Sequence, residues 1–140
     1  MRNDPTALNP SSTARGNGET ILVIEDEPGV REMVRRLLEF RGFRTLVAES
    51  GPAGLALYRL HQAAVRAIIT DMRMPVMQGA QVIQELRAIN PDVRIVAMSG
   101  VIDSNGRMAE ETARLAFLPK PMTSSELVDA LQRVLVAPAA

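Results

Sequence analysis

Five short apolar runs recur along the chain, and polar or mixed segments separate them. The runs lie at residues 21–24, 43–47, 67–69, 93–98 and 115–118. Runs of this length that are rich in β-branched residues are typical of strands covered on both faces of a sheet. The pattern therefore predicts five strands, each buried on both faces.

The segments between these runs have helical spacing, with apolar residues at i, i+3, i+4 and i+7. Such spacing lies at residues 30–38, 53–60, 82–89 and 127–135. Two of these helices have a start signal: Pro28 stands near the first turn of one, and Thr123 and Glu126 form a capping box ahead of another. Residues 103–114 predict a weaker helix, because Gly106 interrupts it and its apolar residues are small.

Strands and helices thus alternate along the chain. This alternation predicts an α/β fold with a doubly wound five-stranded parallel sheet, in which right-handed crossovers place helices on both faces. Such sheets bind ligands at the carboxyl ends of their strands, near the point where the strand order reverses. We expect one domain at residues 20–137, a disordered N-terminal tail at residues 1–19 and a frayed C-terminus at residues 138–140, because neither end has enough apolar residues to pack.

The composition excludes several classes of function. The chain has 16 basic and 16 acidic residues, and this zero net charge argues against a nucleic-acid or membrane-surface binder. It contains no cysteine, which excludes disulfides, thiolate zinc sites and cysteine nucleophiles. The single histidine, His61, ends a predicted helix and cannot form a multi-histidine metal site. No apolar run approaches membrane-spanning length and no signal peptide is recognisable, so we expect a cytoplasmic protein.

Charged and hydroxyl side chains stand at the ends of four predicted strands. Glu25 and Asp26 follow the first strand, Asp71 ends the third, Ser99 ends the fourth and Lys120 follows the fifth. The carboxyl ends of parallel strands meet at one edge of the sheet, so we expect these groups to lie together. Lys120 is also the only lysine among the 16 basic residues, and a compact ammonium fits where a planar guanidinium does not.

Three neighbouring carboxylates repel one another unless a cation lies among them. Their oxygens suit Mg²⁺ (or Mn²⁺), which commonly binds through one or two carboxylates and a phosphate. Beside such an ion and Lys120, an aspartate carboxylate can accept a phosphoryl group, to which Ser99 can donate a hydrogen bond. Taken singly, each of these residues has an ordinary explanation as a helix cap or a turn residue, and for Glu27 the cap is preferred.

Four segments together resemble the receiver domain of two-component response regulators, which has the CheY-like fold. They are ILVIEDEPGVREMV, AIITDMRMPVMQGAQVI, RIVAMSG and FLPKPM, and the likeness extends over about residues 20–137. The resemblance implies a single-domain, flavodoxin-like (α/β)5 sandwich with strand order 2-1-3-4-5. It also implies a cis peptide bond between Lys120 and Pro121.

The resemblance further implies a role for each matching residue. Asp71 is expected to be the phosphoacceptor, while Ser99 and Lys120 contact the phosphoryl group. The metal ligands would be Glu25, Asp26, Asp71 and the main-chain carbonyl of Arg73. Phe117 occupies the aromatic switch position. Two residues depart from the common pattern, since Glu25 replaces an aspartate and Phe117 replaces a tyrosine.

The implied function is that of a phosphoacceptor that hydrolyses its own acyl phosphate, rather than a turnover enzyme. Its partners would be a sensor histidine kinase or a histidine phosphotransfer protein and an unknown downstream protein, with no nucleic acid and no membrane. A phosphorylation-independent interaction module of the same fold is the alternative from a different class. A small phosphohydrolase is a weaker hypothesis, because Arg73 stands where such an enzyme needs a second carboxylate.

Overall fold

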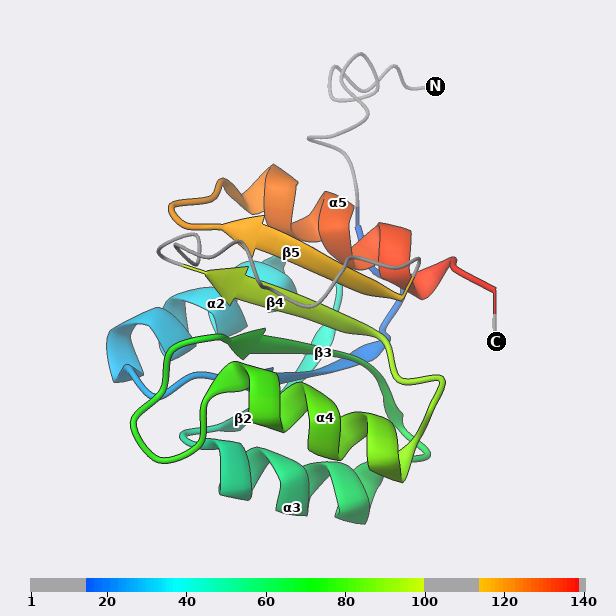
Figure 1. The fold of residues 1–140 in the computed structure, drawn as a ribbon. Helices are drawn as coiled ribbons and strands as arrows, with labels where there is room; N and C mark the ends of the chain where they lie inside the picture. Colours follow the sequence, from blue (N-terminus) through cyan, green and yellow to red (C-terminus); the bar gives the residue numbers. More distant parts are fainter. Residues whose placement is uncertain (1–14, 100–113, 139–140) are drawn as a thin grey trace, which may run out of the picture.

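The computed structural model describes residues 15–99 and 114–138, which form a three-layered α/β fold (Figure 1). In the described ranges, the strands are β1 (Thr20–Ile24), β2 (Arg44–Ala48), β3 (Val65–Asp71), β4 (Ile95–Ser99) and β5 (Leu115–Pro119). The helices are α2 (Pro28–Phe40), α3 (Gly51–His61), α4 (Gly79–Ile89) and α5 (Ser124–Leu135). Each of these elements overlaps one of the predicted segments: β3 extends two residues beyond each end of its apolar run, whereas β2 and β4 begin one and two residues after the start of theirs.

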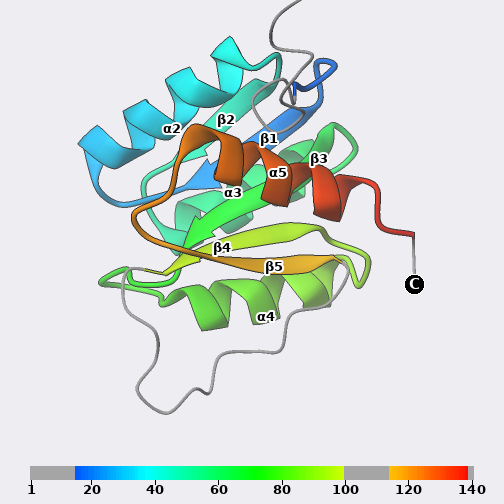
Figure 2. The same ribbon diagram turned by 90° about the horizontal axis from the view of Figure 1, so that it is seen from above.

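The five strands form a parallel sheet in the order β2-β1-β3-β4-β5. Helices α2 and α5 cover one face of the sheet, and α3 and α4 cover the other (Figure 1 and Figure 2). The doubly wound sheet and the strand order are therefore both confirmed. The winding reverses between β1 and β3, so the carboxyl ends of these two strands border the crevice in which such folds bind ligands.

Alternate residues of β1, β3, β4 and β5 enter two core layers, one on each face of the sheet. The prediction of burial on both faces is wrong for the edge strand β2, in which Arg44 and Val47 are exposed. In β1, Ile21 and Val23 pack with α2 and α5, whereas Leu22 and Ile24 pack with α3 and α4, and all four are fully buried. Because both faces are covered, the strands consist of continuous apolar runs. The buried sheet is thus a rigid base for the polar groups at the ends of its strands.

Both ends of α5 are held by side chains. At its start, the predicted capping box is confirmed: Thr123 Oγ1 accepts a hydrogen bond from the Glu126 amide at 3.0 Å, and Glu126 Oε1 accepts one from the Thr123 amide at 2.8 Å. At its other end, Arg94 donates to the carbonyl oxygens of Val134 and Ala137 at 2.5 and 2.6 Å. The position of α5 against the sheet is therefore fixed by the residue directly before β4 as well as by its own packing.

Residues 15–19 form a short strap on the body of the fold. The amide of Gly16 donates to the carbonyl of Arg41 at 2.6 Å, and the amide of Gly18 donates to the carbonyl of Gly42 at 2.8 Å. Gly18 and Gly42 have φ angles of 86° and 93°, which favour glycine. Composition alone assigned these residues to a tail, but main-chain hydrogen bonds, which composition does not reveal, hold them against the domain.

The weaker helix predicted at residues 103–114 lies almost entirely outside the described residues. Only Arg114 is described, in a turn directly before β5. Across residues 15–99 and 114–138, no helix combines the length and the apolar character needed to cross a membrane.

Candidate functional site

The predicted site residues stand at the edge of the sheet where the strands have their carboxyl ends. Asp71 is the last residue of β3 and pairs with Met98, while Ser99 is the last residue of β4 and pairs with Pro119. Glu25 directly follows β1, and its amide extends the pairing with β2 through a bond to the Ala48 carbonyl of 3.0 Å. Chain segments far apart in sequence thus bring their polar groups to a common edge.

Three carboxylates meet at this edge. One oxygen each from Glu25, Asp26 and Asp71 lies within 4.8 Å of the other two. Glu25 and Asp71 are buried, with exposed fractions of 0% and 4%, and Asp26 is half-buried. The cluster is therefore a compact set of carboxylate oxygens, of which Asp26 keeps access to bulk water.

Lys120, which follows β5, adds a positive charge to this cluster. Its Nζ lies 3.4 Å from Asp71 Oδ2 and 3.8 Å from Glu25 Oε1. The Lys120 amide donates to the carbonyl of Ser99 at 2.8 Å, which extends the pairing of β4 and β5 beyond their ends. The peptide bond from Lys120 to Pro121 is cis, as the resemblance implied.

Glu25 is the fully buried carboxylate of the cluster, and only one of its two oxygens accepts a hydrogen bond within the described residues. Its Oε2 accepts a hydrogen bond from the Glu27 amide at 3.1 Å, but in the described part of the chain Oε1 has no hydrogen-bond partner. Burial and the nearby charge of Asp71 raise the pKa of Glu25 to about 7, although the Glu27 amide and Lys120 act in the opposite direction. A buried carboxylate oxygen without a donor is costly unless a cation satisfies it.

Asp71 is fixed by its own loop. Its Oδ1 accepts a hydrogen bond from the Arg73 amide at 3.2 Å, so the chain turns back around the carboxylate. Gly79, at the start of α4, lets the loop close tightly, because a Cβ there would lie 2.7 Å from the carbonyl oxygen of Asp71 and 2.6 Å from Cα of Met72. The Gly79 amide also donates to the Met72 carbonyl at 3.1 Å.

The donor set fits a hard divalent cation. Mg²⁺ and Mn²⁺ prefer carboxylate and carbonyl oxygens, and three carboxylates lie within reach of a single ion. The unsatisfied Oε1 of Glu25 supports this fit, because it is buried and belongs to the same cluster. A single ammonium, Lys120, only partly offsets the charge of three acids.

The structure places the other predicted residues nearby, while their roles stay predictions. Ser99 ends β4, and the backbone of Arg73 contacts Asp71 while its side chain is exposed. Phe117 lies in the middle of β5 and is partly buried beside the core on the α3 and α4 side.

Two residues that the sequence interpretation did not single out also contribute to the site. Gly79 closes the Asp71 loop, and Arg31 of α2 donates to the carbonyl of Glu25 at 2.8 Å. The available sequence signal for Arg31 was its place near the start of a helix, where a basic residue is unfavourable. For Gly79 the signal was a glycine immediately before a run with helical spacing.

Comparison with known proteins identifies the family. The protein-family model described as "Response regulator receiver domain" matches residues 21–132. The chain is 31% identical over 125 residues to the sensor kinase CckA of Brucella abortus (strain 2308), and 34% identical over 109 residues to the response regulator receiver protein Anae109_2439 of Anaeromyxobacter sp. (strain Fw109-5). The matches cover 89% and 77% of this chain, but 13% and 45% of those proteins, so the chain spans less than half the length of these relatives.

A solved structure shows the same relationship at the level of the fold. The response regulator receiver protein from Sinorhizobium medicae WSM419 aligns with a TM-score of 0.75 at 28% identity. The alignment covers 86% of this chain and 96% of that chain. The similarity is therefore to a whole domain of comparable size.

Proposed function

This chain belongs to the response regulator receiver domain family, and on that premise we propose that Asp71 is the phosphoacceptor of a two-component signalling system. The phosphoryl group would come from a sensor histidine kinase or a histidine phosphotransfer protein. The observation that carries the proposal is the place of the Asp71 carboxylate, which lies in a cluster with Glu25 and Asp26 and 3.4 Å from the Lys120 ammonium.

In the proposed reaction, a carboxylate oxygen of Asp71 attacks the phosphorus atom. A P–O bond forms, the P–N bond to the donor histidine breaks, and the electron pair of that bond stays on the histidine nitrogen. Lys120 neutralises part of the negative charge of the phosphoryl oxygens, because its ammonium already faces Asp71. The Arg73 amide holds the carboxylate in place through Oδ1.

Glu25, Asp26 and Asp71 would hold a divalent cation, Mg²⁺ or Mn²⁺, with the main-chain carbonyl of Arg73 as a further ligand. When bound, the ion would supply charge neutralisation for the attacking carboxylate and the phosphoryl oxygens. The buried Oε1 of Glu25 supports this assignment: it accepts no hydrogen bond within the described residues and the Lys120 ammonium lies 3.8 Å away, beyond hydrogen-bond distance, so a metal ion would give it a direct partner.

Phosphorylation would shift the domain between two packings. The new charge on Asp71 would draw the Ser99 hydroxyl toward a phosphoryl oxygen, and the partly buried Phe117 would turn inward. Ser99 lies on β4 and Phe117 lies on β5, so the surface formed by β5 and α5 would change its preference for a downstream protein. Later hydrolysis of the acyl phosphate returns the domain to its first state, so we assign a switch rather than a turnover enzyme.

The direct test is incubation with acetyl phosphate and Mg²⁺, followed by measurement of the intact mass. We expect the chain to gain about 80 Da, the mass of one phosphoryl group, and the matched variant Asp71→Asn to gain nothing. Chelation of Mg²⁺ should also prevent the gain. A full gain in Asp71→Asn would refute the assignment of the acceptor. A folded chain that never gains the mass would instead favour the phosphorylation-independent interaction module.

A further inference from the structure

The side chain of Arg31 reaches from α2 back to the acidic pair. Its Nη1 donates to the carbonyl oxygen of Glu25 at 2.8 Å and to that of Asp26 at 3.5 Å. Helical side chains point toward the N-terminus of their helix, so a residue near the start of α2 reaches the loop between β1 and α2. The guanidinium therefore contacts the backbone that carries two of the clustered carboxylates.

An arginine near the start of a helix is unfavourable unless it has another role. This end of a helix carries a partial positive charge, which disfavours basic side chains and favours acidic ones. Helix α2 has no acidic residue in its first turn, and Glu27 at its N-cap makes no side-chain cap hydrogen bond. By contrast, α5 has Glu126 in its first turn and a complete capping box. The main interaction of Arg31 is instead with the loop of the acidic pair.

We propose that Arg31 is a positioning residue for the metal-binding carboxylates, an inference that rests on the proposed function of the same site. The sheet fixes one side of Glu25, whose amide donates to the Ala48 carbonyl at 3.0 Å. Arg31 holds the other peptide unit of Glu25, because its guanidinium donates to the Glu25 carbonyl oxygen. With both peptide units held, the directions in which the carboxylates of Glu25 and Asp26 leave the backbone are set.

Charge and geometry predict opposite effects of removing Arg31. A positive charge near a metal site repels the ion, so loss of the charge alone would tighten Mg²⁺ binding. Loss of a group that orients metal ligands weakens binding, typically by about 10-fold or more. The direction of the change in affinity therefore separates a positioning role from a purely electrostatic one.

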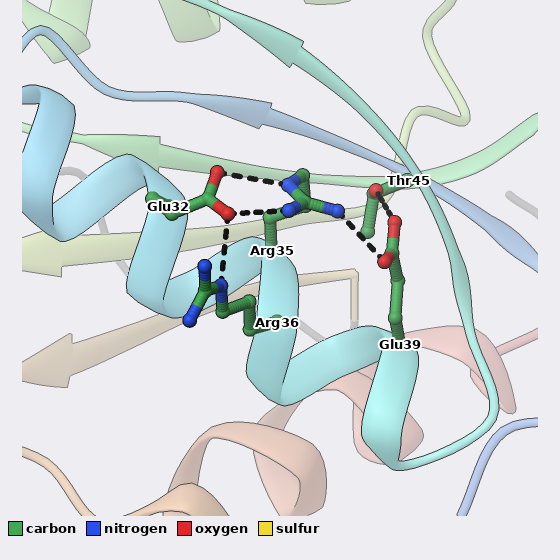
Figure 3. A network of polar contacts seen from close by, with 5 residues as sticks. All are labelled: Glu32, Arg35, Arg36, Glu39 and Thr45. Carbon is green, nitrogen blue, oxygen red and sulfur yellow. Dashed lines mark hydrogen bonds and ion pairs between the residues drawn. The ribbon is translucent and has the colours of Figure 1, made fainter.

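The test is isothermal titration calorimetry with Mg²⁺ on the full chain and its variants. We expect Arg31→Gln to weaken Mg²⁺ binding by about 10-fold. Arg31→Lys should weaken it to a smaller extent, because an ammonium keeps the charge and the hydrogen-bond donors but ends a side chain that is one bond shorter. The matched control is Arg36→Gln, which removes the same charge from the same helix. Arg36 pairs with Glu32 at 2.9 Å on the exposed side of α2 (Figure 3), so its loss should change the affinity by less than about twofold.

Unchanged or tighter Mg²⁺ binding by a folded Arg31→Gln variant would overturn the inference, as would a chain that binds no Mg²⁺ at all. If Arg31→Gln does not fold, Arg31→Lys decides the question, and an affinity equal to that of the unchanged chain would refute a positioning role. Failure of the proposed function is detected by a different experiment, the intact mass of the unchanged chain after treatment with a phosphodonor. The calorimetry measures Mg²⁺ binding alone and needs no phosphodonor.

Discussion

At the scale of single residues, Glu25 couples the stability of the domain to pH. Burial raises the pKa of this carboxyl from 4.5 to about 7, so between these values the folded chain binds a proton that the unfolded chain releases. The stabilisation of the folded state by this bound proton is complete below the unfolded pKa of 4.5 and is lost as the pH rises through about 7. For the metal-free protein we expect a loss on the order of 3 kcal/mol in the free energy of unfolding across this window.

Urea unfolding in the presence of a metal chelator, repeated across this pH window, measures how the free energy of unfolding of the metal-free protein depends on pH. The variant Glu25→Gln cannot lose a proton, so its free energy of unfolding should fall less with rising pH than that of the unchanged chain. Equal pH dependence in the two proteins would show that Glu25 does not cause the loss. Saturating Mg²⁺ should also remove most of the difference, because the ion neutralises the carboxylate.

Gly79 is a second residue whose replacement has a definite expected cost. The atoms that a Cβ would meet are the carbonyl oxygen of Asp71 and Cα of Met72, and main-chain atoms cannot move aside without shifting the Asp71 loop. We expect Gly79→Ala to lower the free energy of unfolding by about 2 kcal/mol and to slow phosphoryl uptake.

The matched control for this change is Gly29→Ala in the first turn of α2, where a Cβ would have nothing within 4 Å. This variant should be stabilised by a few tenths of a kcal/mol, up to about 1 kcal/mol. Urea unfolding of both variants tests the contrast, and equal stability of Gly79→Ala and the unchanged chain would contradict the tight loop.

Single residues also show where sequence reasoning stops. The acidic cluster and Lys120 were predictable, because each follows an apolar run and parallel strands end at a common edge. The contact of Arg31 was not, since it depends on the path of the loop between β1 and α2 and ends on carbonyl oxygens rather than on a charged partner. Gly79 required knowledge of how closely α4 approaches the loop after β3.

At the scale of elements, the capping box of α5 gives the clearest prediction. Thr123→Ala removes the hydroxyl that accepts from the Glu126 amide, so the free energy of unfolding should fall by about 1 kcal/mol. Thr123→Ser keeps the hydroxyl and should lie close to the unchanged chain. Thermal unfolding compares the three proteins, and an equal loss in both variants would mean that packing of the threonine methyl group matters instead.

Element boundaries were predictable where two signals agreed and less so elsewhere. The start of α5 had both a capping box and helical spacing, and the structure confirms it. The Arg94 contacts at the other end of α5 join residues 40 and 43 positions apart, so local sequence patterns could not reveal them. A partly exposed polar network links α2 to β2 (Figure 3) and consists of Glu32, Arg35, Arg36, Glu39 and Thr45. Of its contacts, the spacing along the sequence predicts those within the helix.

At the scale of the whole molecule, alternating strands and helices were enough to predict a doubly wound parallel sheet. The order 2-1-3-4-5 required the resemblance to receiver domains, because alternation alone does not decide where the winding reverses. The strap at residues 15–19 was missed for a different reason. Its glycine amides bond to the turn after α2, and a main-chain interaction of this kind leaves no apolar signature in the sequence.

We propose that groups at the carboxyl ends of β1, β3, β4 and β5 form one cation-dependent phosphoacceptor site. The most direct measurement is a crystal structure of the chain with Mg²⁺ and beryllium fluoride, a mimic of a phosphoryl group. We expect a bond from beryllium to a carboxylate oxygen of Asp71, fluorides within reach of Lys120 and Ser99, and Mg²⁺ on the carboxylates of Glu25, Asp26 and Asp71. A beryllium adduct on another residue, or Mg²⁺ bound away from these carboxylates, would contradict it.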